Sequence, residues 1–223
     1  MTHLQLSAEE LLTTTRAVRR RLDFERTVEP AVIRECIEIA LQAPTGGNTQ
    51  GWQFVVVYDA GKRMALAELY RQAWAKYKAA PGSVFDLAET EKKGARRDQL
   101  KRVATSADYL ADNLEQVPVH VIPCIPGRAD RFTGAMASVG LASVYGSIMP
   151  ATWSYMLAAR NRGLGTCWTT AHLMFEEQAA ELLGIPFAST TQIALIPTAY
   201  SIGTDFKVAL RKSVDDVIHI DSW

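Results

Sequence analysis

The alternation of apolar and polar positions predicts a chain of helices separated by short strands. Ser7 and Glu10 have the spacing of a capping box, and they predict a first helix that runs to about Arg21. Pro30 stands at a favoured first helical position, and the apolar stripe that follows it ends before Pro44. Further helices are predicted over residues 61–79, 99–114 and 175–183.

Short apolar runs rich in β-branched residues predict four buried strands, over residues 52–58, 119–125, 166–169 and 192–199. Pro123 predicts an irregular strand or a strand end, because proline cannot donate a ladder hydrogen bond. Strands that alternate with helices indicate an α/β or α+β fold. We predict one domain over residues 1–223, with a polar helical excursion around residues 81–115.

Residues 135–159 contain no charged side chain, and a stretch of that length could span a bilayer. It also contains Gly140, Gly146 and Pro150, and its hydropathy is modest. We therefore interpret it as one or two helices that are buried on all sides, with no membrane segment. Pro150 is the expected start of a helix that Gly163 ends.

Composition and charge exclude several classes of protein. The 24 basic residues balance the 24 acidic ones, whereas a general nucleic-acid binder shows a basic excess. An apolar content of 48% is too high for a disordered chain. Cys36, Cys124 and Cys167 are odd in number and far apart, which argues against a disulfide framework and indicates a reducing, cytoplasmic location.

Motifs for common catalytic chemistries are absent from the sequence. It has no phosphate-binding P-loop, no nucleophile elbow and no metalloprotease motif, and its histidines never have metal-ligand spacing. Cys167 and His172 could be a nucleophile and its base, but a cysteine beside a strand is more often inert packing. We therefore predict no metal site and no protein nucleophile.

Three polar features remain: the arginine-rich segment 15–21, the glycine-rich loop 45–51 and the basic pair Arg211–Lys212. Guanidinium groups suit phosphate because they make bidentate, charge-assisted hydrogen bonds. A loop of small residues lets the backbone approach a flat ligand. The alternative interpretation of the arginines is a solvated helix face.

Four segments, in the same order, resemble motifs of the nitroreductase family of flavin enzymes: TRAVRRRLD, APTGGNTQGW, WSYMLAARNRGLGTCWTT and LRKSVDDVIHID. Thr15 stands where the family has its first arginine, and Ala17 where it often has serine. Arg16, Arg20 or Lys207 could supply the phosphate contact that Thr15 cannot make.

The resemblance implies a nitroreductase-like fold, in which helices flank a central mixed sheet. It also implies an intertwined homodimer with FMN at the subunit interface. The uncharged stretch 135–159 would then be buried partly against the second subunit, as in obligate interfaces that resemble a domain core cut in half.

The resemblance also assigns residues to parts of the flavin. Arg16 and Arg211 would bind the phosphate, with Ala17 in the same element, and Arg19 would lie at the pyrimidine edge, where a cation stabilises negative charge. The backbone of Thr170 and Ala171 would lie by N5. The loop contributed by the other subunit would consist of Pro44, Thr45, Gly46 and Asn48.

The implied activity is hydride transfer from NAD(P)H to flavin N5 and then to a nitroaromatic, a quinone or a similar small acceptor. Both substrates would use one pocket, so ping-pong kinetics are expected, and the cofactor would supply the redox chemistry. Two alternatives remain open at this point. One is a flavin-storage protein without reductase activity, and the other is a relative with different flavin chemistry, such as small-molecule dehydrogenation or flavin breakdown.

Overall fold

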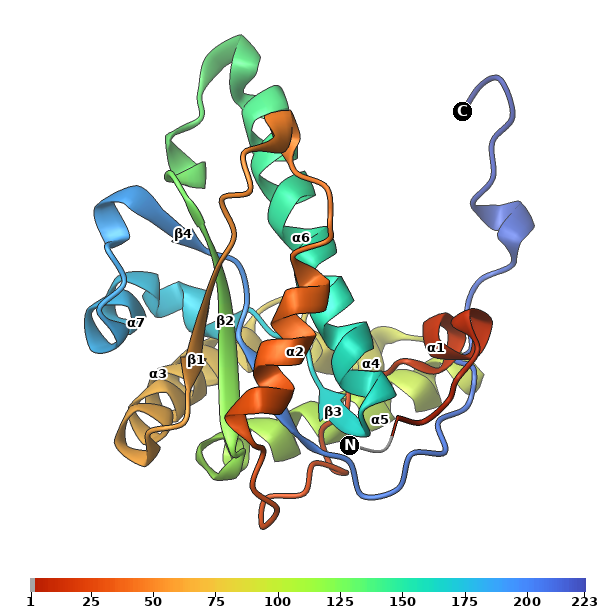
Figure 1. The fold of residues 1–223 in the computed structure, drawn as a ribbon. Helices are drawn as coiled ribbons and strands as arrows, with labels where there is room; N and C mark the ends of the chain where they lie inside the picture. The colour runs from red at the N-terminus through yellow and green to blue at the C-terminus, as the bar shows by residue number, and fades with distance from the viewer. Residues whose placement is uncertain (1–2) are drawn as a thin grey trace.

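The computed structural model describes residues 3–223, in which five strands form one sheet between two layers of helices (Figure 1). Strands β1, β2, β5 and β3 lie side by side in that order, and β4 pairs with the end of β2 beyond β5. This architecture confirms the predicted class of sheet and flanking helices. The strands are β1 (Gln53–Val57), β2 (Val119–Pro126), β3 (Leu164–Thr166), β4 (Thr190–Gln192) and β5 (Ile196–Tyr200).

The pairings between these strands are all antiparallel. A parallel bridge between Ala17 and Thr166 adds the arginine-rich segment to the edge of the sheet beside β3. Val18 strengthens this attachment, because its N–H donates to the carbonyl of Thr166 at 2.8 Å. The predicted mixed sheet is therefore mixed only through this bridge, which fixes the arginines against the sheet.

The two faces of the sheet carry different helices. Helices α2 (Pro30–Ala40) and α6 (Ala137–Asn161) pack on one face, and their side chains meet Val121 of β2. The other face meets Ile122 of β2, and helices α3 (Ala60–Ala79), α5 (Ala95–Asp112) and α7 (Glu176–Leu183) cover it. Successive β2 residues thus belong to opposite cores, as a strand buried on both faces requires. The predicted strands 52–58 and 119–125 and the helices at α2, α3 and α7 are confirmed.

The first helix, α1 (Ala8–Thr14), is shorter than predicted. Its capping box forms as expected, since the side chain of Ser7 accepts from the N–H of Glu10 and the side chain of Glu10 accepts from the N–H of Ser7. The chain becomes extended at Thr15, whose backbone leaves the helical region. β-Branched residues are poor helix formers, and the pairing of the next residues with β3 competes with the helix. The arginines therefore lie on an extended segment, and their interpretation as a helix end is wrong.

Helix α6 is continuous through Pro150, so the prediction that this proline begins a helix is wrong. An interior proline removes one hydrogen bond, and the close packing of the second half of α6, where Tyr155 is fully buried, compensates for that loss. The expectation of burial on all sides is also wrong for the single chain, because Met149 and Trp153 expose 45% and 40% of their surface. No helix within residues 3–223 has the length and hydropathy that crossing a membrane requires.

The last two predicted strands have different limits in the structure. The strand expected at 166–169 is β3, which ends at Thr166. The strand expected at 192–199 is split into β4 and β5, and Pro123 lies opposite the break, between the β2 residues that pair with each. On its other side Pro123 keeps its place opposite Phe54 of β1. Strand β2 itself continues through Pro123 to Pro126, so the prediction that this proline makes its own strand irregular or ends it is wrong; the break lies in the neighbouring strand.

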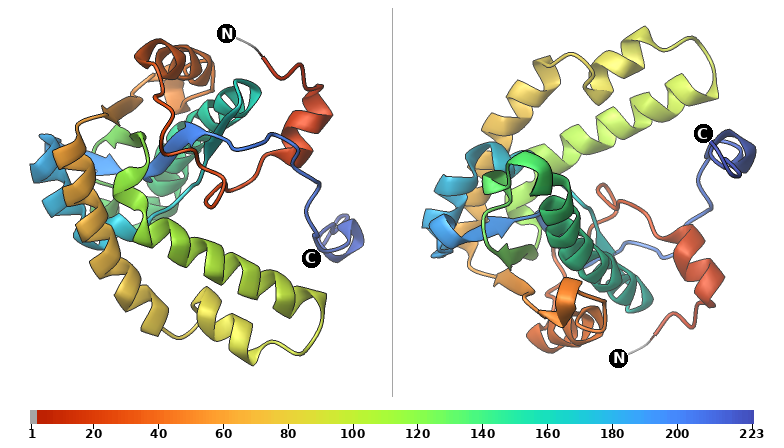
Figure 2. Two further views of the ribbon diagram at one scale, coloured as in Figure 1. Left: turned by 90° about the horizontal axis from the view of Figure 1, so that it is seen from below. Right: turned by 90° about the horizontal axis from the view of Figure 1, so that it is seen from above.

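The charged segment after α3 contains a helix that the sequence did not predict, α4 (Val84–Thr90), and α5 begins four residues earlier than expected, at Ala95. The side chain of Ser83 caps α4 by accepting from the N–H of Asp86 at 3.2 Å. Helices α4 and α5 pack together and project from the body as a hairpin (Figure 2). This hairpin positions one side of the candidate site.

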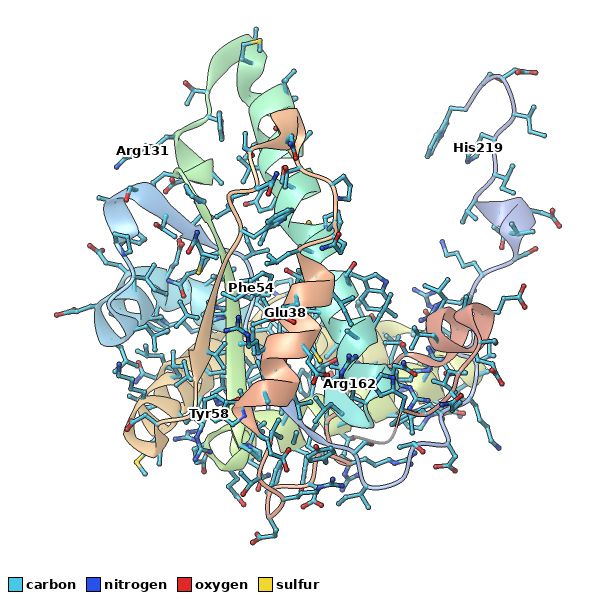
Figure 3. The ribbon with its side chains drawn as sticks, in the orientation of Figure 1. Glu38, Phe54, Tyr58, Arg131, Arg162 and His219 are labelled. Atoms are coloured by element: carbon cyan, nitrogen blue, oxygen red, sulfur yellow. The ribbon has the colours of Figure 1, made fainter. Side chains whose placement is uncertain are left out.

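The C-terminal tail, residues 207–223, extends away from the sheet (Figures 1 and 3, where His219 marks it). It ends in a stack of His219 on Trp223, with ring centroids 4.4 Å apart. Its apolar side chains are exposed in the single chain: Val208, Leu210, Val214, Val217, Ile218, Ile220 and Trp223.

Candidate functional site

Two hollows flank α5, and Arg19 and Val103 line both of them. The larger has a volume of about 790 Å³ and is called here the cationic hollow. The smaller, of about 330 Å³, is called the aromatic hollow. Because they share a wall, one elongated ligand could place an anionic end in the first and a flat ring in the second.

The cationic hollow is lined by six basic side chains and no acidic one, within the chain that the structure describes. Arg16 comes from the segment before the Ala17 bridge, and Arg211 from the tail. Burial, and then the positive charge of Arg211, lower the pKa of the Arg16 guanidinium. Like charges gathered without a counter-charge favour an anion. The basic residues are Arg16, Arg19, Arg20, Lys101, Arg102 and Arg211.

The tail reaches this hollow because Arg16 holds it. The Nε of Arg16 donates to the backbone carbonyl of Lys207 at 3.1 Å. The side chain of Lys207 is not among the groups that line the hollow, so of the suggested substitutes for the Thr15 position only Arg16 and Arg20 lie there. Thr15 itself is buried and donates its hydroxyl hydrogen to the carbonyl of Leu11 at 2.6 Å.

Arg19 lies at the junction of the two hollows. Its Nη1 donates to the hydroxyl of Ser106 on α5 at 3.1 Å. Burial raises the pKa of the Cys167 thiol, and the positive charge of Arg19 opposes that rise. These contacts keep a guanidinium beside the aromatic hollow.

The aromatic hollow is walled by Tyr70, Trp74 and Tyr77 of α3, and by Thr170 and Ala171 after β3. Tyr70 and Trp74 stack with ring centroids 6.1 Å apart. The hydroxyl of Tyr70 shares a hydrogen bond of 2.7 Å with the hydroxyl of Thr169. Burial raises the pKa of Tyr70 to about 12, so its phenol stays neutral at physiological pH. The site can hold a flat ring between aromatic and backbone groups.

The glycine-rich loop lies elsewhere, against the end of α6 where the helix begins (Figure 1). The N–H of Gly46 donates to the hydroxyl of Ser147 at 2.9 Å, and a Cβ at Gly46 would collide with the hydroxyl of Ser143. Pro44, Gly46 and Asn48 are exposed, and Thr45 is half-buried. None of these loop residues lines either hollow of this chain, so one chain brings together six of the predicted site residues and leaves four apart: Arg16, Ala17, Arg19, Thr170, Ala171 and Arg211 on one side, and Pro44, Thr45, Gly46 and Asn48 on the other.

Sequence reasoning missed the contribution of α5 to the site. Gln99, Arg102 and Ser106 line the cationic hollow and are spaced three and four residues apart, which places them on one helix face. That spacing is present in the sequence, but the face is polar and looks like any solvated helix surface. The aromatic wall from α3 was not predicted either, although Tyr70, Trp74 and Tyr77 have the same helical spacing.

The alternative pairing of Cys167 with His172 does not form a nucleophile and base. Both side chains are fully enclosed, and the Sγ of Cys167 contacts the carbonyl of Trp168 at 3.7 Å. Burial raises the pKa of the Cys167 thiol and lowers the pKa of His172 to about 3. A protonated thiol is a poor nucleophile, which agrees with the packing role predicted for Cys167.

His120 and His172 make stability depend on pH. Their ring nitrogens have no hydrogen-bond partner within residues 3–223, and burial lowers the pKa of both imidazoles from 6.5 to about 3. Between these two values the unfolded chain binds protons that the folded chain excludes, so the free energy of unfolding falls as the pH falls from 6.5 towards 3.

We predict that replacing His120 and His172 by phenylalanine makes this fall less steep, by up to about 1.4 kcal/mol per pH unit for each imidazole. Urea unfolding at a series of pH values measures the slope. An equal slope in the wild-type protein and the variant would contradict the prediction. The exposed His219 replaced by phenylalanine is the matched control, and its slope should equal that of the wild type.

The protein-family model for the nitroreductase family matches residues 12–200 of this chain. A BluB-like flavoprotein from Clostridium difficile 630 superposes with a TM-score of 0.68 at 15% identity, over 96% of this chain and 99% of that one. Iodotyrosine deiodinase bound to FMN and 3-iodo-L-tyrosine superposes with a TM-score of 0.67 at 15% identity, over 96% and 99%. The FMN- and NADPH-dependent nitroreductase NfnB from Sphigopyxis sp. strain HMH gives 0.63 at 20% identity, over 98% and 100%. At these identities the likeness to the solved structures establishes the fold.

Proposed function

Because the chain belongs to the nitroreductase family, whose model matches residues 12–200, we propose that it is an FMN-dependent oxidoreductase. FMN bound in the two hollows would take a hydride from NAD(P)H at N5 and pass it to a nitroaromatic, a quinone or a similar acceptor. One observation supports this most strongly: no acidic side chain of the described residues lines the cationic hollow, and Arg19 lines both this hollow and the aromatic one.

The residues present fit the two ends of FMN. Arg16 and Arg211 would hold the phosphate, since guanidinium groups make bidentate contacts with phosphate oxygens. Arg19 would lie beside the pyrimidine edge, where a fixed cation stabilises negative charge on the reduced ring. The first N–H groups of a short helix have no partner within that helix, and such a helix begins at Ala171, where the backbone of Thr170 and Ala171 would contact N5.

The aromatic hollow also indicates what kind of acceptor fits. Among the described residues, Arg19 is the one charged side chain that lines it, and the rest of the wall consists of aromatic, aliphatic and hydroxyl groups. Burying a charge without a partner is costly, whereas a flat neutral ring can stack on Trp74 or Tyr77. We therefore favour uncharged aromatic acceptors over zwitterionic ones.

The site is proposed to be completed by a second copy of the chain. Tyr145, Met149 and Trp153 of α6 form an exposed apolar hollow of about 470 Å³ together with Trp168. Trp168 also lines the aromatic hollow, so a second copy that covers this face of α6 would lie next to the flavin ring. Its own loop around Gly46, which is attached to α6 by Ser147, could then reach that ring. The exposed apolar tail would be covered in the same homodimer.

Steady-state kinetics test the proposed reaction. One pocket that serves both substrates in turn predicts parallel double-reciprocal plots when NAD(P)H and a quinone are varied together. Intersecting plots would mean that both substrates bind at once, against the proposal. A protein that retains FMN but reduces neither quinones nor nitroaromatics would support the storage alternative or other flavin chemistry.

A further inference from the structure

The cationic hollow holds more positive charge than one FMN phosphate needs. A phosphate monoester carries a charge of about −1.5 to −2 at neutral pH, whereas six basic side chains line the hollow. The proposed function assigns Arg16 and Arg211 to that phosphate and Arg19 to the ring. This leaves Arg20 and two cations of α5, Lys101 and Arg102, without a role.

Lys101 and Arg102 are the cations of the α4–α5 hairpin that line the cationic hollow. Both are exposed, and their side chains make no hydrogen bond or ion pair within residues 3–223. Arg96, by contrast, pairs with Glu91, and Lys78 pairs with Asp108 at 2.8 Å. The two α5 cations are therefore the hairpin's unneutralised positive charge at the rim of the site.

Other α5 side chains complete the same polar surface. Gln99 precedes Arg102 by three residues and Ser106 follows it by four, so all three lie on one face of α5, and all three line the hollow. Ser106 is already bonded to Arg19 at 3.1 Å. Gln99 makes no side-chain hydrogen bond within the described chain and can donate its amide hydrogens.

We propose that Lys101 and Arg102, assisted by Gln99, bind the 2′-phosphate of NADPH, and that this contact makes the enzyme prefer NADPH to NADH. The proposal rests on the proposed function, because the nicotinamide must lie over the flavin in the aromatic hollow. The remainder of the donor then extends into the adjoining cationic hollow, which α5 also lines. NADPH differs from NADH only by that phosphate, which is the group that unpaired guanidinium and ammonium groups attract.

Binding of two nucleotide fragments to the FMN-loaded protein tests the proposal without turnover. In isothermal titration calorimetry, 2′,5′-ADP should bind more tightly than 5′-AMP, and the difference should shrink as salt is added. The double variant Lys101→Ala/Arg102→Ala should weaken the binding of 2′,5′-ADP roughly 10- to 100-fold and that of 5′-AMP much less. The kcat/KM for NADPH should fall by a similar factor, and that for NADH should fall much less.

Lys92→Ala/Lys93→Ala is the matched control, because it removes two charges from the same hairpin at positions that do not line the hollow. It should leave both nucleotides unaffected. Arg102→Lys keeps the charge but loses the bidentate fork, so it should retain part of the preference for 2′,5′-ADP.

Equal affinity for 2′,5′-ADP and 5′-AMP in the wild-type protein would overturn the proposal. So would loss of FMN from the Lys101→Ala/Arg102→Ala variant with the nucleotide preference intact, because the two cations would then serve the FMN phosphate in place of the arginine that this chain lacks at position 15. Either result leaves the proposed function standing as long as a nicotinamide donor still reduces the bound flavin. A chain that never binds FMN contradicts the proposed function instead.

Discussion

Alanine at both Arg16 and Arg211 is expected to give a protein that is purified without its yellow colour. Each guanidinium is proposed to make charge-assisted hydrogen bonds with the FMN phosphate, which are worth about 1.5–3 kcal/mol apiece. The loss of both should therefore raise the Kd for FMN by roughly 100-fold or more. Fluorescence titration of the apoprotein with FMN measures this change.

The single variants separate binding from folding. Arg16 also holds the tail through the carbonyl of Lys207, whereas within residues 3–223 the side chain of Arg211 bonds only to the carbonyl of Leu210. Arg211→Ala thus removes a phosphate contact without loosening the tail from Arg16. Arg34→Ala on α2 is the control, since that side chain is 81% exposed and pairs with Glu38 of the same helix. FMN affinity that is unchanged in the double variant would refute the phosphate assignment.

Met149→Glu combined with Trp153→Glu is expected to convert a homodimer into a monomer and to release FMN with it. These side chains lie one turn apart on the exposed apolar face of α6, and buried charges at an interface are strongly unfavourable. The loss of two central contacts worth about 2 kcal/mol each would raise the dissociation constant of the dimer roughly 1,000-fold. Sedimentation velocity measures the assembly, and the visible spectrum measures the flavin.

The matched control for this experiment is Met64→Glu on α3, because Met64 is 60% exposed and lies on a different helix from the proposed interface. It should stay dimeric and yellow. If the α6 double variant folds, remains a dimer and keeps its FMN, then the α6 face is not the interface and the loop of a second chain does not complete the site.

Local sequence signals were sufficient to predict an element where its own residues determine where it begins and ends. Pro30 and the apolar stripe after it define α2, and Gly184 ends α7 with φ at 71°, a left-handed conformation that suits glycine. They failed where tertiary pairing competes with local preference. The residues after Thr14 pair with β3 instead of extending α1, and α6 passes through Pro150 because its second half is buried.

The candidate site shows a similar division. The arginine-rich segment and Arg211 could be predicted to meet at one place, because their side-chain chemistry suits phosphate and the family resemblance brings them together. The face of α5 that carries Gln99 and Arg102 could not, since a polar helix face gives no sign of what it will face across a hollow. The remote position of the Gly46 loop could be anticipated only from the expected dimer.

The most direct test of the whole account is to record the visible spectrum of the purified protein while NADPH is added in the absence of oxygen. We expect a yellow protein with one FMN per chain that bleaches on addition of NADPH and regains its colour when a quinone is added. A yellow protein that does not bleach with NADPH or NADH, or a colourless protein that cannot be reconstituted with FMN, would contradict it.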